Sequence, residues 1–182
     1  LIFVPIARAL SGLANILIPC KARASVLLVA NARSRAALPV SHPNVVEIVE
    51  NGVDLTTFRA PLAHKASPAG TIRLVFMGRL VAWKAADVTL QALAKVRAQH
   101  VAAELEILGD GVERGRLEAK AFELGLSEAV RFHGFLPQAD CADFLAKADA
   151  LILNSIYECG GAVVLESISA GLPVIGPDWG GP

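Results

Sequence analysis

The sequence has little of what marks several large classes of protein. Neither charge is in excess, because 17 Lys and Arg balance 17 Asp and Glu. Binding to nucleic acid therefore has no electrostatic support, since its usual mark is a basic patch with a high pI. Only three cysteines occur, Cys20, Cys141 and Cys159. Their scattered spacing forms neither a zinc pattern nor a disulfide framework, which fits a reducing compartment.

Motifs for metals and membranes are also lacking. No Asp-x-Asp occurs, so nothing indicates a metal-held diphosphate. The apolar residues 1–20 contain Pro5, Arg8 and Pro19 and lack a basic start, which argues against a signal peptide. The uninterrupted apolar run is too short to span a bilayer, so we expect a buried or interfacial helix there. With 54% hydrophobic and 19% charged residues, the composition is that of a soluble globular protein.

From residue 71 onwards, short apolar runs alternate with amphipathic stretches. Ala86, Leu90 and Leu93, for example, share one helical face. Such alternation predicts a doubly wound, Rossmann-like α/β domain with a parallel sheet covered on both faces. The predicted strands are residues 72–77, 105–108, 129–135, 150–153 and 173–176.

Ligands of such sheets bind beyond the carboxyl ends of the strands. This rule selects the Gly-rich and polar loops 78–84, 109–111, 134–138, 154–161 and 177–181.

The chain before residue 71 is organised differently. A strand is predicted at 25–30, followed by a helical piece that ends near Leu38. Residues 41–70 are rich in proline and contain the turn Asn51-Gly52, which predicts a short strand at 45–49 and then a crossing between domains.

The clearest indication of chemistry is a strand-to-helix corner near residue 158. A loop with Glu158, Gly160 and Gly161 leads into a helix whose exposed N–H groups attract phosphate, and glycine lets the phosphate approach. Glu166, inside this helix, can reach hydroxyls beside the phosphate, as a carboxylate does for ribose. Glu158 can meet a second polyol, the sugar. Singly, each glutamate is better explained as a solvated charge, but two of them around Gly-Gly favour a site.

Two cations follow the strand at 72–77, in the segment Gly78-Arg79-Leu80-Val81-Ala82-Trp83-Lys84. Arg79 offers a planar fork to phosphate oxygens, and Lys84 a compact charge. A diphosphate leaving group gains negative charge as the sugar bond breaks, so fixed cations stabilise the transition state more than the ground state. Ordinary surface charges are the alternative, and the position at the strand end favours the functional interpretation.

Two further features are less specific. Gly109-Asp110-Gly111 has part of a dinucleotide fingerprint, but position 114 is arginine and the third glycine comes at 115. We interpret it as a tight βα turn near the nucleotide. His133 precedes Gly134 at a strand end, so it either borders the nucleotide base or is a satisfied structural histidine. Cys159 has no visible base partner and is interpreted as a small filler.

These residues resemble retaining glycosyltransferases of family 4 (glycosyl transferases group 1), which have the GT-B fold. The resemblance covers residues 45–182 well and 1–40 loosely. Its most specific part is the pair of glutamates Glu158 and Glu166 combined with Gly-Arg-x4-Lys. The matching phrases are ENGVDLTTF (50–58), VFMGRLVAWKAADVTLQAL (75–93), LEILGDGVERGRLE (105–118), VRFHGF (130–135), SIYECGGAVVLESISAGLPVI (155–175) and DWGGP (178–182).

The resemblance implies a role for each residue of this set. Arg79 and Lys84 would bind the donor diphosphate and Glu158 would hold sugar hydroxyls, so these three would be catalytic. Glu166 would bind the ribose. The remaining donor-binding residues would be Gly78, His133, Gly160, Gly161, Ala162 and Val163.

The resemblance also implies an activity. Family members transfer a sugar from a nucleotide sugar, such as a UDP-, GDP- or ADP-sugar, with retention of configuration and without a metal or other cofactor. The acceptor would be a sugar, a lipid-linked molecule or a small molecule. The implied location is cytoplasmic, and members that build cell-envelope or polysaccharide precursors work at the inner face of the membrane, with peripheral association.

On this resemblance, residues 1–40 are a remnant of an N-terminal acceptor domain, 41–70 cross between domains, and 71–182 form a donor-binding domain without its last helices. We therefore expect these 182 residues by themselves to bind nucleotide weakly and to transfer no sugar. Two positions depart from the family pattern. Glu158-Cys159-Gly160-Gly161 replaces the common Glu-Gly-Phe-Gly, so an aromatic wall is missing, and Ala85 replaces the glycine that usually follows the lysine.

Two other classes of function stay open. A nucleotide-sugar epimerase on the same fold would need further acid/base residues near the sugar, which the sequence does not show. A non-catalytic nucleotide-sugar-binding module would have no physical need for the charges of Arg79, Lys84, Glu158 and Glu166. A dehydrogenase is disfavoured by the spacing of the glycines.

Overall fold

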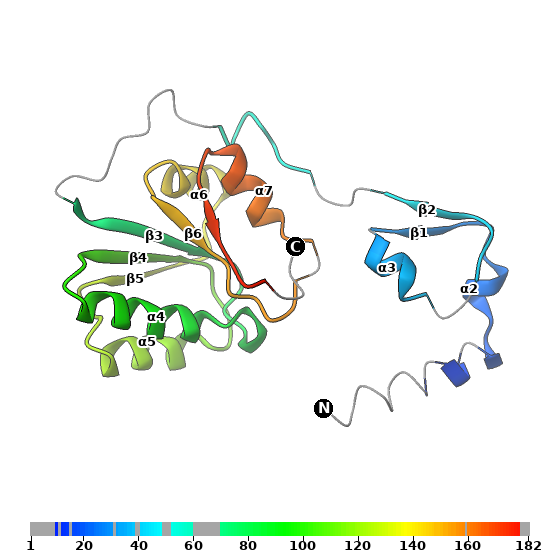
Figure 1. Cartoon of the computed structure of the whole chain (residues 1–182), viewed down its shortest axis with the longest axis horizontal. Helices are drawn as coiled ribbons and strands as arrows, with labels where there is room; N and C mark the ends of the chain where they lie inside the picture. Colours follow the sequence, from blue (N-terminus) through cyan, green and yellow to red (C-terminus); the bar gives the residue numbers. More distant parts are fainter. Residues whose placement is uncertain are drawn as a thin grey trace. The chain divides into compact units, whose positions relative to one another are not determined.

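The computed structural model describes residues 10, 12–14, 16–30, 32–38, 41–48, 52–59, 70–158 and 160–178. The chain divides into two compact units, residues 1–50 and 51–182 (Figure 1). This division falls inside the segment 41–70 that the sequence analysis interprets as a crossing. The assignment of the units to acceptor and donor domains stays a prediction. Cys159, and residues 179–181 of the last predicted loop, lie outside the described residues.

The first unit contains a small parallel sheet. Strands β1 (Leu27–Val29) and β2 (Val45–Glu47) pair in parallel, and they confirm the strands predicted at 25–30 and 45–49 with shorter bounds. Helices α2 (Cys20–Arg23) and α3 (Ala32–Ala36) accompany them.

Near the start of the chain, apolar side chains are exposed rather than buried: Leu13, Ile16 and Leu17 are 54%, 76% and 72% exposed. Burial of this segment within the chain was therefore a wrong expectation for these residues, and the interfacial alternative stays a prediction. Among the described residues, no helix has the length and apolar composition needed to cross a membrane.

The second unit is built on a five-stranded parallel sheet, which confirms the predicted α/β fold. The strand order is β5-β4-β3-β6-β7. Each predicted strand is present, with ends that match the prediction or differ from it by one or two residues. Their bounds are β3 Ile72–Met77, β4 Ala103–Leu108, β5 Val130–Gly134, β6 Ala150–Ile152 and β7 Val174–Ile175.

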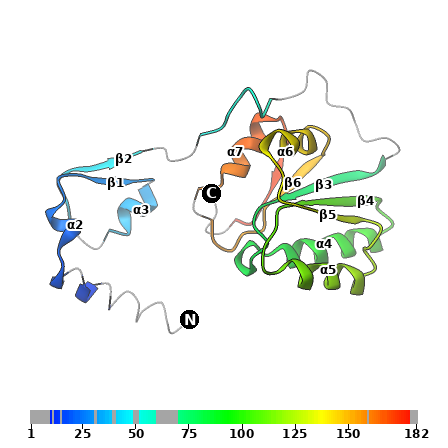
Figure 2. The same ribbon diagram turned by 180° about the vertical axis from the view of Figure 1, so that it is seen from behind.

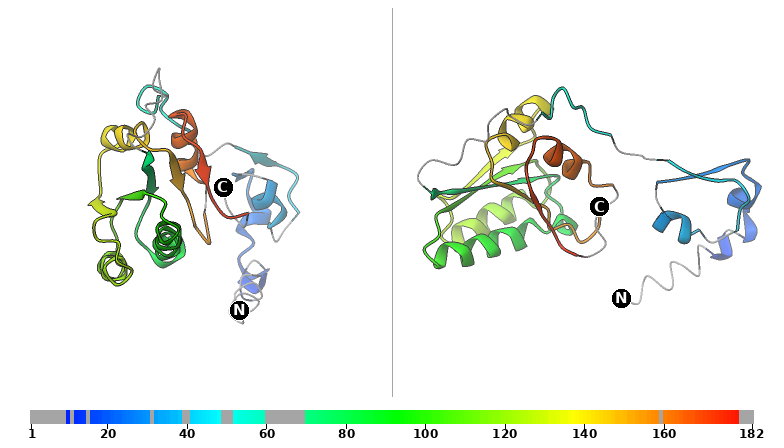
Figure 3. Two further views of the ribbon diagram at one scale, coloured as in Figure 1. Left: turned by 60° about the vertical axis from the view of Figure 1, so that its left-hand side comes forward. Right: turned by 45° about the horizontal axis from the view of Figure 1, so that its top comes forward.

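Helices cover both faces of this sheet, as Figures 1, 2 and 3 show. Helices α4 (Ala86–Ala98) and α5 (Arg114–Glu123) lie together on one face. Helices α6 (Gln138–Leu145) and α7 (Ala162–Ser169) lie on the other.

Two hydrophobic clusters follow from the alternation of side chains along the central strand β3. Phe76 packs into the cluster beneath α4 and α5, with Leu90, Leu93 and Ile107. Its neighbours Val75 and Met77 belong to the cluster that contains residues of α6 and α7.

The strand order creates a switch point. From β3 the chain moves outward through β4 and β5, and then returns to the other side of β3 as β6. The loops that leave the carboxyl ends of β3 and β6 therefore start from neighbouring strands and lead to helices on opposite faces. Such a point is where doubly wound sheets bind their ligands.

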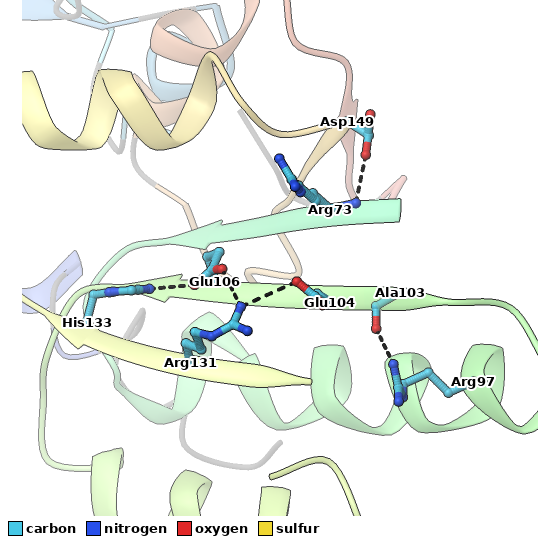
Figure 4. A network of polar contacts seen from close by, with 8 residues as sticks. All are labelled: Arg73, Arg97, Ala103, Glu104, Glu106, Arg131, His133 and Asp149. Atoms are coloured by element: carbon cyan, nitrogen blue, oxygen red, sulfur yellow. Dashed lines mark hydrogen bonds and ion pairs between the residues drawn. The ribbon is translucent and has the colours of Figure 1, made fainter. Parts of the chain in front are cut away.

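Asp149, the residue before β6, is bound to the central strand β3. Arg73 N donates to Asp149 Oδ2 (2.7 Å; Figure 4), and Asp149 N donates in return to Arg73 O (2.8 Å).

In the phrase ENGVDLTTF, Asp54 accepts hydrogen bonds from Thr56 and Thr57. These bonds lower the pKa of Asp54 to about 2. The turn that they hold leads to Phe58, which is 1% exposed in the second core cluster.

One buried hydroxyl predicts a stability effect. Ser167 of α7 is fully buried, and its Oγ has no hydrogen-bond partner among the described residues. Replacing it with alanine removes an unsatisfied polar group and is expected to raise the free energy of unfolding by about 1 kcal/mol. Urea denaturation of the two proteins checks this. A comparable loss of stability would mean that the hydroxyl has a partner after all.

Candidate functional site

The loop after β3 enters the site through a single 3₁₀ turn, η2 (Ala82–Lys84). Lys84 N donates to Val81 O (3.0 Å), and Ala85 N donates to Ala82 O (3.1 Å). Ala85 then adopts a left-handed conformation, with φ 50° and ψ 37°, before α4 begins. This conformation favours glycine. It gives a physical reason for the glycine that the resembled family usually has after the lysine.

Two residues of the loop after β6 are hydrogen-bonded to α4 and to the loop after β3. Asn154 Nδ2 donates to Thr89 Oγ1 of α4 (2.9 Å), and Ile156 N donates to Trp83 O (2.8 Å). Together these bonds hold residues 154–158 against the turn that carries Lys84.

An ion pair joins the two loops. Lys84 Nζ contacts Glu158 Oε2, and their side chains are only 15% and 12% exposed. Ser155, 2% exposed, donates from its Oγ to the same carboxylate oxygen (3.0 Å). Charges so far removed from water need partners of this kind. The structure thus brings together two of the three residues interpreted as catalytic. Their roles stay predictions.

A pocket of about 420 Å³, lined in part by the loop after β3, lies over the carboxyl ends of β3, β4 and β5. Arg79, the third of those residues, is exposed and lines it. Phe135 stands at its edge with 86% of the side chain exposed. The other lining residues are Met77, Gly78, Leu108, Gly109, Asp110, Leu136 and Cys141.

Backbone packing of the first two loops forms one wall of this pocket. Leu80 N donates to Asp110 O and Gly78 N donates to Leu108 O, both at 2.9 Å. A Cβ on Gly109 would lie 2.0 Å from Gly78 O, and one on Gly111 2.3 Å from Leu80 O. The turn Gly109-Asp110-Gly111 is therefore required by a close approach of two main chains.

Helix α7 begins at the strand-to-helix corner that is predicted from the sequence to bind phosphate. Its N-cap, Gly161, has φ 59° and ψ 40°, and Val164 N donates to Gly161 O (2.8 Å). No side chain among the described residues caps this end. Gly160 and Val163 are half-buried and Ala162 is exposed. First-turn amides of this kind bind anions. The assignment of Gly160, Gly161, Ala162 and Val163 to the donor stays a prediction.

Glu166 lies one turn further along α7, half-buried. Its carboxylate makes no hydrogen bond or ion pair within the described part of the chain, and burial raises its pKa. The pKa of the Cys141 thiol is raised mainly by burial and then by the charge of Glu166.

The raised pKa of Glu166 predicts a pH dependence of stability. The folded protein holds this proton more tightly than the unfolded chain, so the free energy of unfolding falls as pH rises through the range between the ordinary and the raised pKa. Glu166→Gln removes that contribution and is expected to gain stability relative to the wild type only above this range. Urea denaturation at about pH 4 and pH 7 measures it. A difference that does not change with pH would contradict the expectation.

His133 has two neighbours away from the pocket. Its Nε2 lies 2.5 Å from Glu106 Oε2 (Figure 4), and its ring is 4.5 Å from that of Phe144. Arg131 also donates to Glu106 (3.0 Å), so this is a polar cluster on β4 and β5. Of the two alternatives for His133, these contacts fit a structural histidine. Its place among the donor-binding residues stays a prediction.

Sequence reasoning missed Ser155, the tie between Asn154 and Thr89, and the apolar lining of the pocket. Serine in a loop is common, and nothing in the spacing shows that its hydroxyl turns inward. The pocket is formed by residues from four separate segments, so no local motif marks it.

Comparison with known proteins agrees with this arrangement. A structure of Anabaena Alr3699/HepE in complex with UDP and glucose matches with a TM-score of 0.70 at 21% identity, covering 91% of this chain and 48% of that one. The second unit has the fold of the C-terminal domain of GT-B proteins. The chain belongs to the family described as glycosyl transferases group 1, whose model matches residues 61–182.

Two curated relatives are a glycogen synthase of Mycobacterium tuberculosis and a D-inositol 3-phosphate glycosyltransferase of Jonesia denitrificans. The first is 32% identical over 136 residues, covering 75% of this chain, and the second is 33% identical over 181 residues, covering 86%. The chain spans 32% and 42% of the length of these relatives.

Proposed function

We propose that the protein containing this chain transfers a sugar from a nucleotide sugar to an acceptor with retention of configuration, and that residues 71–182 bind the donor. One observation carries the proposal: Lys84 and Glu158 form a nearly buried ion pair at the switch point, and Lys84 shares the loop after β3 with Arg79, which lines the pocket. Membership of the glycosyl transferases group 1 family supports it.

Each part of a nucleotide sugar has a counterpart among these groups. The apolar pocket lined by Phe135 would take the base, and Glu166 the ribose. The diphosphate would lie between Arg79, Lys84 and the amides at the start of α7. Glu158 would bind the hydroxyls of the sugar. UDP is the first nucleotide to test, because the Anabaena structure contains UDP and glucose.

Bond cleavage would draw on the fixed charges. As the bond between sugar and diphosphate breaks, negative charge grows on the leaving oxygen, and cations already in place stabilise it without reorganising. In the structure the charge of Lys84 is balanced by Glu158. A bound diphosphate would offer Lys84 a second anion and leave Glu158 to accept hydrogen bonds from the sugar.

Calorimetry of the full-length protein with UDP, GDP and ADP tests the binding half of this proposal. One nucleotide is expected to bind, and Arg79→Ala and Glu166→Ala are each expected to weaken it about ten- to a hundredfold, as loss of a hydrogen bond to a charged group does. Arg116→Ala is the matched control, because Arg116 is 51% exposed on α5 and pairs with Glu113. The proposal fails if no nucleotide binds, or if both variants bind as the wild type does.

The reaction products distinguish a transferase from an epimerase and from a binding module. With a panel of UDP-, GDP- and ADP-sugars, a transferase passes the sugar to an acceptor or, slowly, to water with release of the nucleoside diphosphate. An epimerase returns a different sugar isomer, and a binding module returns the donor unchanged.

A further inference from the structure

The described part of the second unit has three buried hydroxyl side chains, and two of them form hydrogen bonds with residues of the loop after β6. The buried polar side chains among the described residues are Thr89, Ser155 and Ser167. Thr89 accepts from Asn154, and Ser155 donates to Glu158. Ser167 has no partner there. Placing a hydroxyl in a core costs free energy unless it makes a hydrogen bond, so the bond from Ser155 to Glu158 is what justifies its position.

We propose that Ser155 is a positioning residue that holds the Glu158 carboxylate in place when Lys84 turns to the donor diphosphate. This inference rests on the proposed function. It assigns a task to a residue that is not among the site residues predicted from the sequence.

Lys84 and Ser155 contact the same oxygen of Glu158, which supports separate roles for these two residues. Lys84 Nζ and Ser155 Oγ both contact Oε2 of Glu158. If a diphosphate draws Lys84 away, the carboxylate loses its contact with that ammonium group in a place where it is 12% exposed, and the phosphates repel it. A neutral hydroxyl retains the carboxylate without cancelling its charge. Glu158 then stays in position and keeps its negative charge and its other acceptor sites for hydroxyls of the sugar.

Ser155 itself is held in place. Its neighbour Asn154 is bound to α4 through Thr89, and its other neighbour Ile156 is bound through its main chain to Trp83 O. The hydroxyl is thus fixed by contacts on both sides that do not involve Lys84 or Glu158. It can hold the carboxylate at the same point before and after the donor binds.

Kinetics of the full-length protein test this, with whichever sugar of the UDP-, GDP- and ADP-sugar panel the wild type turns over. Ser155→Ala is expected to lower kcat about ten- to a hundredfold, while KM for the donor stays within about threefold, because the nucleotide contacts remain. Ser167→Ala is the matched control, since it removes a second buried hydroxyl that has no such bond, and it should leave both constants unchanged.

A double-mutant cycle separates positioning from a general structural effect. In the background of Glu158→Gln, Ser155→Ala should have no further effect on kcat, because the group through which it acts is already changed. An equal loss in both backgrounds would overturn the proposal, as would a Ser155→Ala enzyme with wild-type kcat. Either result leaves the proposed function standing. A wild type that turns over no nucleotide sugar would overturn both.

A structure of the wild-type protein with bound UDP tests the proposal without relying on any variant to fold. Lys84 Nζ is expected within hydrogen-bonding distance of a phosphate oxygen, with Ser155 Oγ still donating to Glu158. Release of Glu158 from Ser155 in that complex would overturn the assignment.

Discussion

Replacing Lys84 with alanine is expected to lower kcat/KM of the full-length protein by roughly 30- to 1000-fold, or about 2–4 kcal/mol of transition-state stabilisation. The ammonium group is held at the end of a buried strand by the η2 turn, and its side chain is 15% exposed. A charge fixed in such surroundings acts on the leaving diphosphate with little screening by water. The variant loses this charge at the point where the reaction needs it.

Steady-state kinetics with the preferred nucleotide sugar measures this loss. Lys95→Ala is a suitable control, because Lys95 is exposed on α4, the helix that follows Lys84, and its removal should leave the rate unchanged. The variant also leaves Glu158 without its cation, so the melting temperature must show that the protein remains folded. A loss of less than about tenfold would contradict the diphosphate role.

Gly109→Ala is expected to destabilise the second unit by about 2–5 kcal/mol, because a strained backbone conformation and a backbone collision add up. The residue has φ 137°, which side-chain-bearing residues rarely adopt, and its new Cβ would lie 2.0 Å from Gly78 O. Relief would require the loops after β3 and β4 to separate. That movement would also open the pocket wall and displace Arg79, so nucleotide affinity should fall as well.

Urea denaturation of the full-length protein checks the stability, with Gly115→Ala as the control. Gly115 lies inside α5, where an added Cβ meets nothing within 4 Å, so alanine should be neutral or stabilise by up to about 1 kcal/mol. If both substitutions have the same effect, the close approach at Gly109 does not constrain the fold.

The sequence was informative wherever a structure depends on local pattern. The strand Ile72–Met77 and the helix Ala86–Ala98 appear as predicted, because apolar side chains repeat with the period of each element and glycine or polar residues bound them. Ends were less certain: the predicted strand at 105–108 begins at Ala103, and the strand at 173–176 is only Val174–Ile175. Strand ends depend on hydrogen bonds to a neighbour, which one segment's sequence does not contain.

For the site, the sequence predicted which residues take part but not which of them contact one another. Glu158 and Lys84 were singled out separately, each from its position after a strand. Nothing in the sequence indicated that they pair, that Ser155 joins them, or that His133 is bound to Glu106. Each of these contacts joins side chains whose directions depend on how two elements pack.

The sequence alone determined that this chain has alternating strands and helices, that glycine and charged residues gather at the ends of those strands, and that its motifs resemble one family. Only the tertiary structure decided which of these residues meet. Lys84 and Glu158 lie 74 positions apart, and they touch because β6 pairs with β3 rather than with β5, its predecessor in the chain. That choice comes from long-range packing of the sheet and its helices, and local sequence periodicity does not specify it.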